Sequence, residues 1–420
     1  MSAENNYKVE EFTITPLKGN SVKIDLSVNS LASFEYYEDV LSPTITAKAT
    51  FAIVDIKNLP QGFDIYGGEK VDIRISTTSS NNNLILNDAK RSLYVRSASV
   101  DKKSNLGTYS IEMVSRETLV SEVTRVKNRF DGKINESVKS IFSQLKSQKT
   151  LVTEDSVNKY SFIGNIRRPF DIIMWLCPKA VPVGSKGFGT AGYLFFETQD
   201  GYTFKSVDKL ISQKSSFTYE KTEKVDPYNP KNKLRILSSN ISKNNDILSS
   251  LRMGMYTNES LFYSLYDNKV IPFKYTLQDK YSSLSKSSQT SNYPKLPEGI
   301  ENTTSRFVVR TLDVGNLSLD GKMETIENLP KYQAEAAVRY NLLFSQILNI
   351  VIPCNLDLRA GQVIECRIPE STANSLNKKF ESQQTGNYMI ANLCHKFQGN
   401  QSYTLLSLIR DSYELKSGGN

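Results

Sequence analysis

Apolar and polar residues alternate in several stretches of the first 120 residues, and each of these stretches predicts a strand. The clearest is 70–75, where every second residue is apolar. Further strands are expected at 44–53, 93–100 and 108–114, and the polar run 79–83 is expected at the tip of a hairpin. The beginning of the chain is therefore predicted to be a β region.

The middle of the chain mixes helical and strand periods. Apolar residues share one helix face from Ile134 to Leu145, and a second helix is expected at 169–177, where a proline suits the first turn. A hairpin is expected at 192–204 with Asp200-Gly201 as its turn. The serine-rich stretch 281–297 has almost nothing to bury and is expected to be a mobile loop or linker. The remaining expected elements are helices at 246–251 and 332–343 and a last β region at 347–408.

The pattern of the first β region returns near the end of the chain. Residues 68–75 (GEKVDIRI) match residues 361–368 (GQVIECRI) at an offset of 293. The strands that follow match at an offset of 294, which places Tyr109 on Tyr403. Each copy predicts a small antiparallel unit of about four to six strands that closes like a barrel to hide its edges. With two such units in one chain, a trimer would present six near-equivalent modules.

Composition and charge argue against several classes of protein. The net charge of +8 arises from 52 basic and 44 acidic residues that are interspersed, whereas nucleic-acid-binding proteins usually gather the excess in one stripe. The polar start is not typical of a secretory leader, and the apolar run 350–352 is too short to span a membrane, so no membrane insertion is expected. The four cysteines lack paired spacing and are expected to be free thiols in a reducing cytoplasm.

Metal and cofactor sites find little support in the sequence. His395 is the only histidine, which excludes a two-histidine metal motif, and its place in the repeat predicts an ordinary residue at the rim of a strand. Cys354, Cys366 and Cys394 could form a tetrahedral zinc site with this histidine, but structural zinc ligands normally come in close pairs. Cys366 also takes the inward place of Ile73, which favours a small core residue. We therefore expect no metal and no cofactor.

Three further features have ordinary explanations. The glycine-rich segment 184–192 lacks the Gly-Lys-Ser/Thr ending of a phosphate loop and is expected to be a connector. Glu197 and Asp200 flank a predicted turn without the features of a glycosidase site. A basic cluster could face a lumen through which DNA passes, but a solvated helix face or a partner contact is the default expectation. Its members are Arg125, Lys127, Arg129 and Lys133.

Five segments follow one another in a characteristic order. They are 37–43 (YEDVLSP), 162–171 (FIGNIRRPFD), 175–178 (WLCP), 195–201 (FFETQDG) and 407–412 (SLIRDS). In this order they resemble the central baseplate hub protein of T-even-like contractile-tailed phages, over most of the chain. None of the segments is a catalytic signature, so the specificity of the resemblance lies in their order.

The resemblance implies an α+β chain, mainly β, with two tudor-like or SH3-like β-barrel domains and an α+β insertion between them. The expected division is a first barrel at 1–120, a middle region at 121–343, a second barrel at 344–413 and a flexible tail at 414–420. The resemblance also implies a homotrimeric hub ring with pseudo-sixfold symmetry that connects a central spike to a tail tube. Such a ring is a structural part of the virion's tail baseplate and is assembled in the host cytoplasm.

The partners implied by the resemblance are the spike protein, tail-tube or tube-initiator proteins and the tape measure protein, while DNA passes through the lumen without specific binding. Two alternatives from other classes are a cell-wall-degrading tail enzyme and a carbohydrate-binding adhesin, although the sequence shows no positive feature for either. Candidate contact residues are Arg167 and Arg168, because arginine is enriched at interfaces, together with Arg410 and Asp411 near the end of the chain. Exposed barrel strands are expected to carry the contacts between subunits.

Overall fold

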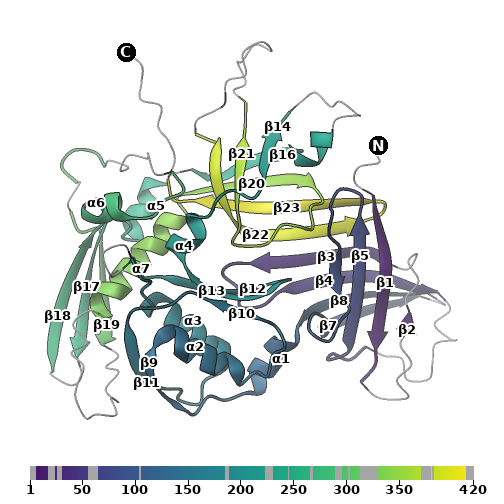
Figure 1. The fold of residues 1–420 in the computed structure, drawn as a ribbon, viewed down its shortest axis with the longest axis horizontal. Helices are drawn as coiled ribbons and strands as arrows, with labels where there is room; N and C mark the ends of the chain where they lie inside the picture. Colours follow the sequence, from purple (N-terminus) through teal and green to yellow (C-terminus); the bar gives the residue numbers. More distant parts are fainter. Residues whose placement is uncertain are drawn as a thin grey trace.

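The computed structural model describes residues 6–17, 24–25, 31–54, 65–103, 106–184, 189–222, 230–244, 246–264, 268–288, 296–300, 303–312, 329–369, 380 and 383–412. One 15-stranded sheet dominates the molecule, and the helices lie with three smaller sheets beside it (Figure 1). The prediction of an α+β chain that is mainly β is confirmed. Within the described part, no helix is long and apolar enough to cross a membrane.

Both copies of the repeat lie in the large sheet, and their strands follow one another in the same order. In the first copy this order is β3 (Leu31–Asp39), β4 (Thr46–Val54), β8 (Leu106–Ser115), β7 (Leu93–Lys103), β5 (Lys70–Thr77) and β1 (Tyr7–Thr15), with β2 (Ile24–Asp25) beside β1 and β6 (Leu84–Leu86) beside β5. In the second copy it is β16 (Ser238–Asn244), β20 (Gln346–Pro353), β23 (Gln401–Arg410), β22 (Gly386–Gln398), β21 (Val363–Arg367) and β14 (Thr218–Lys221), followed by β15 (Arg235–Ile236). The copies differ at the last position, because β1 is antiparallel to β5 whereas β14 is parallel to β21. The middle of the chain thus supplies β14, β15 and β16 to the second copy.

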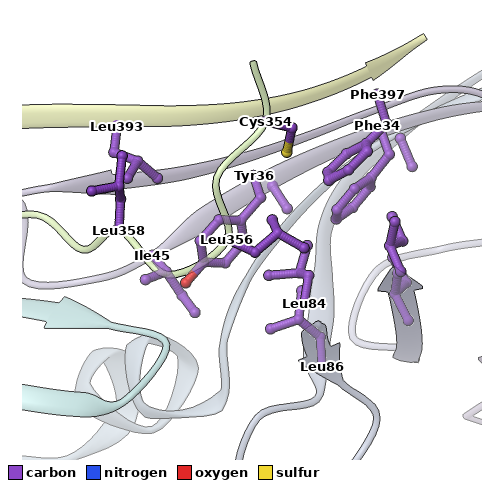
Figure 2. Packing of buried hydrophobic residues seen from close by; sticks show 14 of the residues in the cluster. Phe34, Tyr36, Ile45, Leu84, Leu86, Cys354, Leu356, Leu358, Leu393 and Phe397 are labelled. Atoms are coloured by element: carbon purple, nitrogen blue, oxygen red, sulfur yellow. The ribbon is translucent and has the colours of Figure 1, made fainter. Parts of the chain in front are cut away.

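The two copies are joined to each other rather than closed separately. β22 pairs antiparallel with β3 from Asn392–Asp39 to Gln398–Ser33, which makes one sheet of both copies. One hydrophobic cluster also runs through both, and Figure 2 shows Phe34 beside Phe397. Among the described residues, backbone pairing does not close either copy into a barrel of its own. A separate barrel hides its edge strands by closing on itself. Here the edge strand β3 of the first copy is covered by β22 of the second copy instead.

The strand register confirms the repeat and corrects its alignment. Lys70 pairs with Tyr94 in the first copy, and Val363 pairs with Met389 in the second, so the offset is 293 for β5 and β21 but 295 for β7 and β22. The predicted offset of 294 for the later strands is therefore wrong by one residue. At 295 the inward Ile111 falls on the buried Leu406. A shift of one residue exchanges the two faces of a strand. The predicted match of Tyr109 with Tyr403 therefore paired an inward position with an outward one.

A shared bulge supports the corrected alignment. The register between β7 and β8 shifts between Val95 and Ser97, and the register between β22 and β23 shifts between Ile390 and Asn392, again at an offset of 295. A bulge opposes two residues to one and bends the strand at a fixed place. Both copies therefore preserve the same bend as well as the same strand order.

The middle region has hydrophobic clusters of its own, separate from the core of the large sheet. Its elements are α1 (Arg116–Val123), β9 (Arg129–Lys133), α2 (Ile134–Ser143), β10 (Leu151–Thr153), β11 (Lys159–Ile163), α3 (Pro169–Leu176), η4 (Cys177–Lys179), β12 (Tyr193–Thr198), β13 (Gly201–Ser206), α4 (Val207–Ile211), η5 (Pro230–Leu234), α5 (Ile247–Arg252), β17 (Thr257–Ser264), β18 (Lys269–Thr276), α6 (Leu277–Lys280), η6 (Tyr281–Ser283), β19 (Arg306–Leu312) and α7 (Leu329–Leu343). The predicted helices at 134–145 and 169–177 are confirmed as α2 and α3, and a proline opens α3. The predicted hairpin is β12–β13, but its two-residue turn is Gln199-Asp200 because Gly201 already pairs with Thr198.

The serine-rich stretch is not a mobile loop over its described part. Leu284 and Lys286 are buried, and the Ser287 backbone and hydroxyl groups both donate hydrogen bonds to Asp411 at 2.9 Å. The prediction failed because serine reads as polar in a sequence, whereas its short side chain also satisfies a buried carboxylate. Residues 289–295 and the tail 414–420 lie outside the described residues.

Candidate functional site

One face of the large sheet is apolar, and the opposite face carries a polar surface where β22, β3, β4 and β8 adjoin. This polar surface is the first candidate. A row of alternating charge crosses four neighbouring strands in register, from Lys396 on β22 through Glu35 on β3 and Lys48 on β4 to Glu112 on β8. Lys396 lies 2.9 Å from Glu35, and Lys48 lies 2.9 Å from Glu112. Hydrogen bonds from Lys48 and Arg96 lower the pKa of Glu112. We call this surface the polar face; its charges are largely paired with one another.

Arg167 and Arg168, the first pair of predicted contact residues, lie just before α3. Arg168 is exposed and forms ion pairs with Glu122 at 2.6 Å and with Asp171 at 2.8 Å. The Arg167 guanidinium lies over the Trp175 ring at 5.8 Å from its centroid. These contacts hold both arginines in place at the surface.

Two exposed apolar side chains adjoin these contacts: Ile166 directly precedes Arg167, and Val123 follows Glu122, the ion-pair partner of Arg168. Val123, at the end of α1, is 80% exposed, and Ile166 is 63% exposed. Ile166 also has a φ of +59°, a left-handed conformation that is unfavourable for a β-branched residue. The surface formed by the end of α1 and the loop before α3 thus combines arginine with apolar groups, a composition typical of protein interfaces.

The second predicted pair, Arg410 and Asp411, is buried in the single chain. Arg410 is 2% exposed, donates a hydrogen bond to the Thr385 carbonyl oxygen at 3.0 Å and lies over the Tyr388 ring. Asp411 is 3% exposed and accepts a hydrogen bond from Arg339 at 2.8 Å. Both residues therefore hold the end of β23 in place within the chain, although the sequence suggested them as contact residues.

Arg339 was missed by the sequence analysis. It is buried on α7 between Asp208 on α4 and Asp411, with both carboxylates at 2.8 Å. The attraction of these two carboxylates outweighs the opposing effect of burial and raises the pKa of Arg339. A single arginine among the alanines, valine and leucines of the helix was the only available signal. Such an arginine indicates a buried ion pair, but it does not identify the acidic residues that complete the pair.

Glu197 belongs to a buried ion cluster rather than to a cleft. Lys149 pairs with Glu197 and lies 3.0 Å from Glu117, and the backbone N–H of Ile45 also donates to Glu197 at 3.0 Å. Burial raises the pKa of Glu197, although Lys149 opposes this effect. The second carboxylate of the possible glycosidase pair is Asp200, which forms an ion pair with Arg359 at 3.0 Å. Each of the two carboxylates is therefore occupied in tying the middle region to the large sheet.

A second missed residue, Glu38, connects three parts of the chain. Its carboxylate accepts hydrogen bonds from the Tyr36 hydroxyl at 2.9 Å, from the Gln199 backbone at 2.7 Å and from the Ala360 backbone at 2.8 Å. Burial raises its pKa, and nearby Arg359 opposes that shift. These bonds join β3 to the β12–β13 turn and to the loop before β21, so the carboxylate fixes the junction of the two copies.

The histidine and cysteines of the possible zinc site are buried parts of the fold. His395 is 1% exposed, stacks on Tyr36, and has its Nδ1 at 2.9 Å from the Thr404 hydroxyl. The prediction that it is a rim residue is wrong, because β3 covers this part of β22. Burial raises the pKa of Cys354 and of Cys366 to about 12, which favours protonated thiols over metal-binding thiolates. No metal-binding group of three or more such side chains occurs within the described ranges.

The remaining sequence candidates lie at the surface or partly outside the described residues. The four basic residues of the cluster at 125–133 are all exposed and lie in the segment between α1 and β9 and on β9 itself. The Arg125 guanidinium donates a hydrogen bond to the Glu122 carbonyl oxygen at 2.7 Å. Residues 185–188 of the glycine-rich segment are not described.

Comparison with known proteins gives likeness in fold alone. No protein-family model matches the chain, and no curated protein matches it in sequence. A tail protein from Neisseria meningitidis MC58 has a similar fold, with a TM-score of 0.57, 11% sequence identity and coverage of 97% of this chain and 97% of that chain. The 43 kDa tail protein of prophage MuSo2 from Shewanella oneidensis is similar as well, with a TM-score of 0.56, 8% identity and coverage of 96% and 99%.

Proposed function

We propose that this chain is a structural protein of a phage-type tail baseplate, where three copies form a hub ring with pseudo-sixfold symmetry between a central spike and a tail tube. The observation that carries the proposal is the duplicated module: each chain holds two copies with the same strand order and the same bulge. The similar folds of two tail proteins, one of them from a prophage, extend along almost the whole chain and support the same assignment.

The duplication explains how such a ring can serve two partners. A trimer has three identical chains to offer a threefold spike and six similar modules to offer a sixfold tube. Tail-tube or tube-initiator proteins would meet the six modules, and the tape measure protein would pass through or end at the ring. The arginine-bearing surface before α3, with Arg167 and Arg168, is a proposed contact on the ring.

The polar face would line the lumen. Lys48 and Lys396 each have an acidic partner at 2.9 Å, so they offer little net attraction to the phosphates of passing DNA. Such a surface lets a polyanion pass without binding it specifically. The proposed role is not enzymatic, and it places the protein in the virion's tail after assembly in the host cytoplasm.

Multi-angle light scattering during size-exclusion chromatography tests the ring. The purified protein is expected to elute at three times the mass of one chain, and at a larger mass when it is mixed with the spike protein made by the same phage. Cryo-electron microscopy of isolated tails should then show this chain between spike and tube. A strict monomer both alone and with the spike would contradict the proposal, as would clearing of a cell-wall gel by the purified protein.

A further inference from the structure

The two-stranded sheet of β9 and β11 has one buried face and one exposed face, and it lies beside α2 at the lower margin of Figure 1. The buried face carries three aromatic side chains of the cluster around α2, which are Phe130, Tyr160 and Phe162. On the exposed face Arg129 lies opposite Ile163, and Lys133 lies opposite Lys159. Directly opposite residues of an antiparallel pair point to the same side of a sheet. This face therefore places cations beside an exposed isoleucine.

The opposed pair of Lys133 and Lys159 is unfavourable by itself. Like charges that lie directly opposite each other on a sheet repel, because their Cβ atoms are only about 4.5–5.5 Å apart. Within the described ranges, neither lysine has a carboxylate at ion-pair distance. A carboxylate placed between the two amines would turn this repulsion into attraction. The pair therefore favours an anionic group that is supplied from outside the chain.

The loop 163–168 continues this surface in a fixed conformation. The backbone N–H of Ile166 donates to the Val126 carbonyl oxygen, and the N–H of Val126 donates to the Arg167 carbonyl oxygen, both at 3.0 Å. Asn165 and Ile166 are both left-handed, with φ values of +50° and +59°. Such a conformation is strained for a β-branched residue and persists only where the surrounding structure holds it, as it often does at binding sites.

A glycine allows this loop to lie against the segment before β9. A Cβ on Gly164 would lie 2.5 Å from the Val126 carbonyl oxygen, so a larger residue would push the two segments apart. The loop thereby holds Ile166 outward, close to Ile163, which is 42% exposed. We call the exposed face of β9 and β11, together with 123–128 and 163–168, the β9–β11 surface.

Most cations of the β9–β11 surface lack a carboxylate partner. Arg129 lies 3.9 Å from Asp131, and Arg168 is neutralised by the two ion pairs described above. Five other cations form no ion pair among the described residues, namely Arg125, Lys127, Lys133, Lys159 and Arg167. Against them stands Glu136 at the start of α2, an exposed carboxylate that also has no ion pair among these residues. The surface therefore combines an excess of positive charge with exposed apolar groups.

We propose that the β9–β11 surface binds an acidic segment of a partner protein, in which carboxylates alternate with apolar side chains. Carboxylates of this segment lie between Lys133 and Lys159 and beside Lys127, while its apolar side chains cover Ile163 and Ile166. Complementary charge of this kind selects the partner and fixes its register. The inference rests on the proposed place in a tail and goes beyond it, because it names the chemistry of one partner.

A nucleic acid fits the same surface less well. A phosphate backbone repeats its charge at every nucleotide and would meet the carboxylates of Glu122, Asp131 and Glu136. A protein segment can instead place uncharged side chains opposite these carboxylates. The exposed isoleucines also gain nothing from a sugar–phosphate backbone, whereas arginine beside apolar groups is typical of protein interfaces. Charge and apolar exposure together favour the acidic protein segment.

Carbodiimide cross-linking of isolated tails tests the partner. The reagent joins a lysine amine to a carboxylate in contact with it, with loss of water, and mass spectrometry identifies the joined peptides. We expect Lys127, Lys133 and Lys159 to be joined to aspartates or glutamates within one short segment of another tail protein. The same lysines should react with acetic anhydride more slowly in tails than in the purified chain.

A charge-reversal variant makes the test specific. Lys133→Glu with Lys159→Glu should lower the yield of the Lys127 cross-link by about tenfold or more, because like charges would then face each other across the interface. The matched control, Lys214→Glu with Lys269→Glu, makes the same change of charge at two exposed lysines outside the β9–β11 surface and should leave the yield unchanged. Light scattering should give the same mass for both variants as for the unchanged protein.

The outcomes separate this inference from the proposed function. Tails that contain this chain, but in which Lys133 and Lys159 form no cross-link and are acetylated as fast as in the purified chain, overturn the inference and leave the proposed function in place. Cross-links to a second copy of this chain alone, or ultraviolet cross-links from the surface to DNA, overturn it as well. Absence of the chain from purified tails overturns both. An equal loss of the Lys127 cross-link in the control variant shows that Lys133 and Lys159 do not hold the partner, and it also overturns the inference.

Discussion

Among single residues, Lys149 has the clearest role in stability, because it is buried between two carboxylates. Burial lowers its pKa, but the attraction of Glu197 and Glu117 outweighs this effect and leaves the pKa raised. Lys149→Met would leave two carboxylates buried without a cation, which we expect to cost about 3–5 kcal/mol of unfolding free energy at pH 8. Urea denaturation measures this loss, with the exposed Lys127→Met as the control that should change little.

The pH dependence of the Lys149→Met variant supplies a further check. Burial already raises the pKa of Glu197, and without the opposing lysine this pKa would lie further above the unfolded value of about 4.3. The penalty is then smallest when the Glu197 carboxylate is protonated, and it grows as the pH rises through the folded-state pKa of this group. A loss of stability that is the same at pH 5 and pH 8 would show that the cluster is hydrated in solution.

His395 should make the fold sensitive to mild acid. Burial lowers its pKa to about 3, whereas an unfolded histidine titrates near 6.5. The unfolded state therefore binds the proton first, and the stability present above pH 6.5 is lost as the pH falls from 6.5 toward 3. At pH 5 this loss is about 2 kcal/mol relative to pH 7.5. His395→Phe keeps a ring over Tyr36, and urea titrations should show that its stability falls less between the two pH values. Equal slopes for the two proteins would contradict the burial of a neutral imidazole.

At the scale of elements, the glycine that precedes β21 is more constrained than its equivalent before β5. Gly361 and Gly68 have φ values of +81° and +95°, so alanine is strained at both positions. A Cβ on Gly361 would lie 2.6 Å from the Phe196 ring, whereas a Cβ on Gly68 would lie 3.2 Å from a methyl group of Leu17. We expect Gly361→Ala to destabilise the protein by about 1–3 kcal/mol more than Gly68→Ala. Thermal unfolding measures both variants, and equal losses would show that the backbone strain alone decides the cost.

The sequence predicted elements better than it predicted which face each strand buries. α2 and α3 follow from apolar spacing and a first-turn proline, and the offset of 293 follows from the glycine that opens each first strand. The next strands slipped by one because Tyr109 and Tyr403 look alike in a sequence, although only the register shows which side each one faces. The burial of His395 could not be predicted either, because it depends on β3, a strand more than 350 residues away in the chain.

The predicted contact residues differ in their surroundings for a related reason. Arginine is common at interfaces and in buried ion pairs alike, and its type does not separate the two. Arg168 is exposed with two carboxylates beside it, while Arg410 is enclosed by backbone carbonyl groups and a tyrosine ring. The difference is set by the tertiary neighbours of each arginine, which the sequence analysis could not supply.

For the whole molecule, the shared core predicts that the two copies of the repeat lose structure together. Phe397 on β22 stacks on Phe34 of β3 with ring centroids 6.1 Å apart and also contacts Tyr7 of β1 at 5.2 Å, so one side chain packs against two strands of the other copy. Phe397→Ala is expected to cost about 3–5 kcal/mol through lost burial and the cavity left behind. Because the cavity borders both copies, amide exchange should accelerate in β3 and β4 as much as in β22 and β23.

Hydrogen–deuterium exchange with mass spectrometry distinguishes this cooperative behaviour from two independent modules. Phe142→Ala is the matched control, since it removes the same side chain from the separate cluster around α2, where the ring packs on Tyr202 of β13. That variant should accelerate exchange in α2 and β13 before it affects the joined sheet. Acceleration in Phe397→Ala that stops at β22 and β23 would mean that each copy holds its own structure. In that case the β22–β3 junction would contribute little to the stability of the joined sheet.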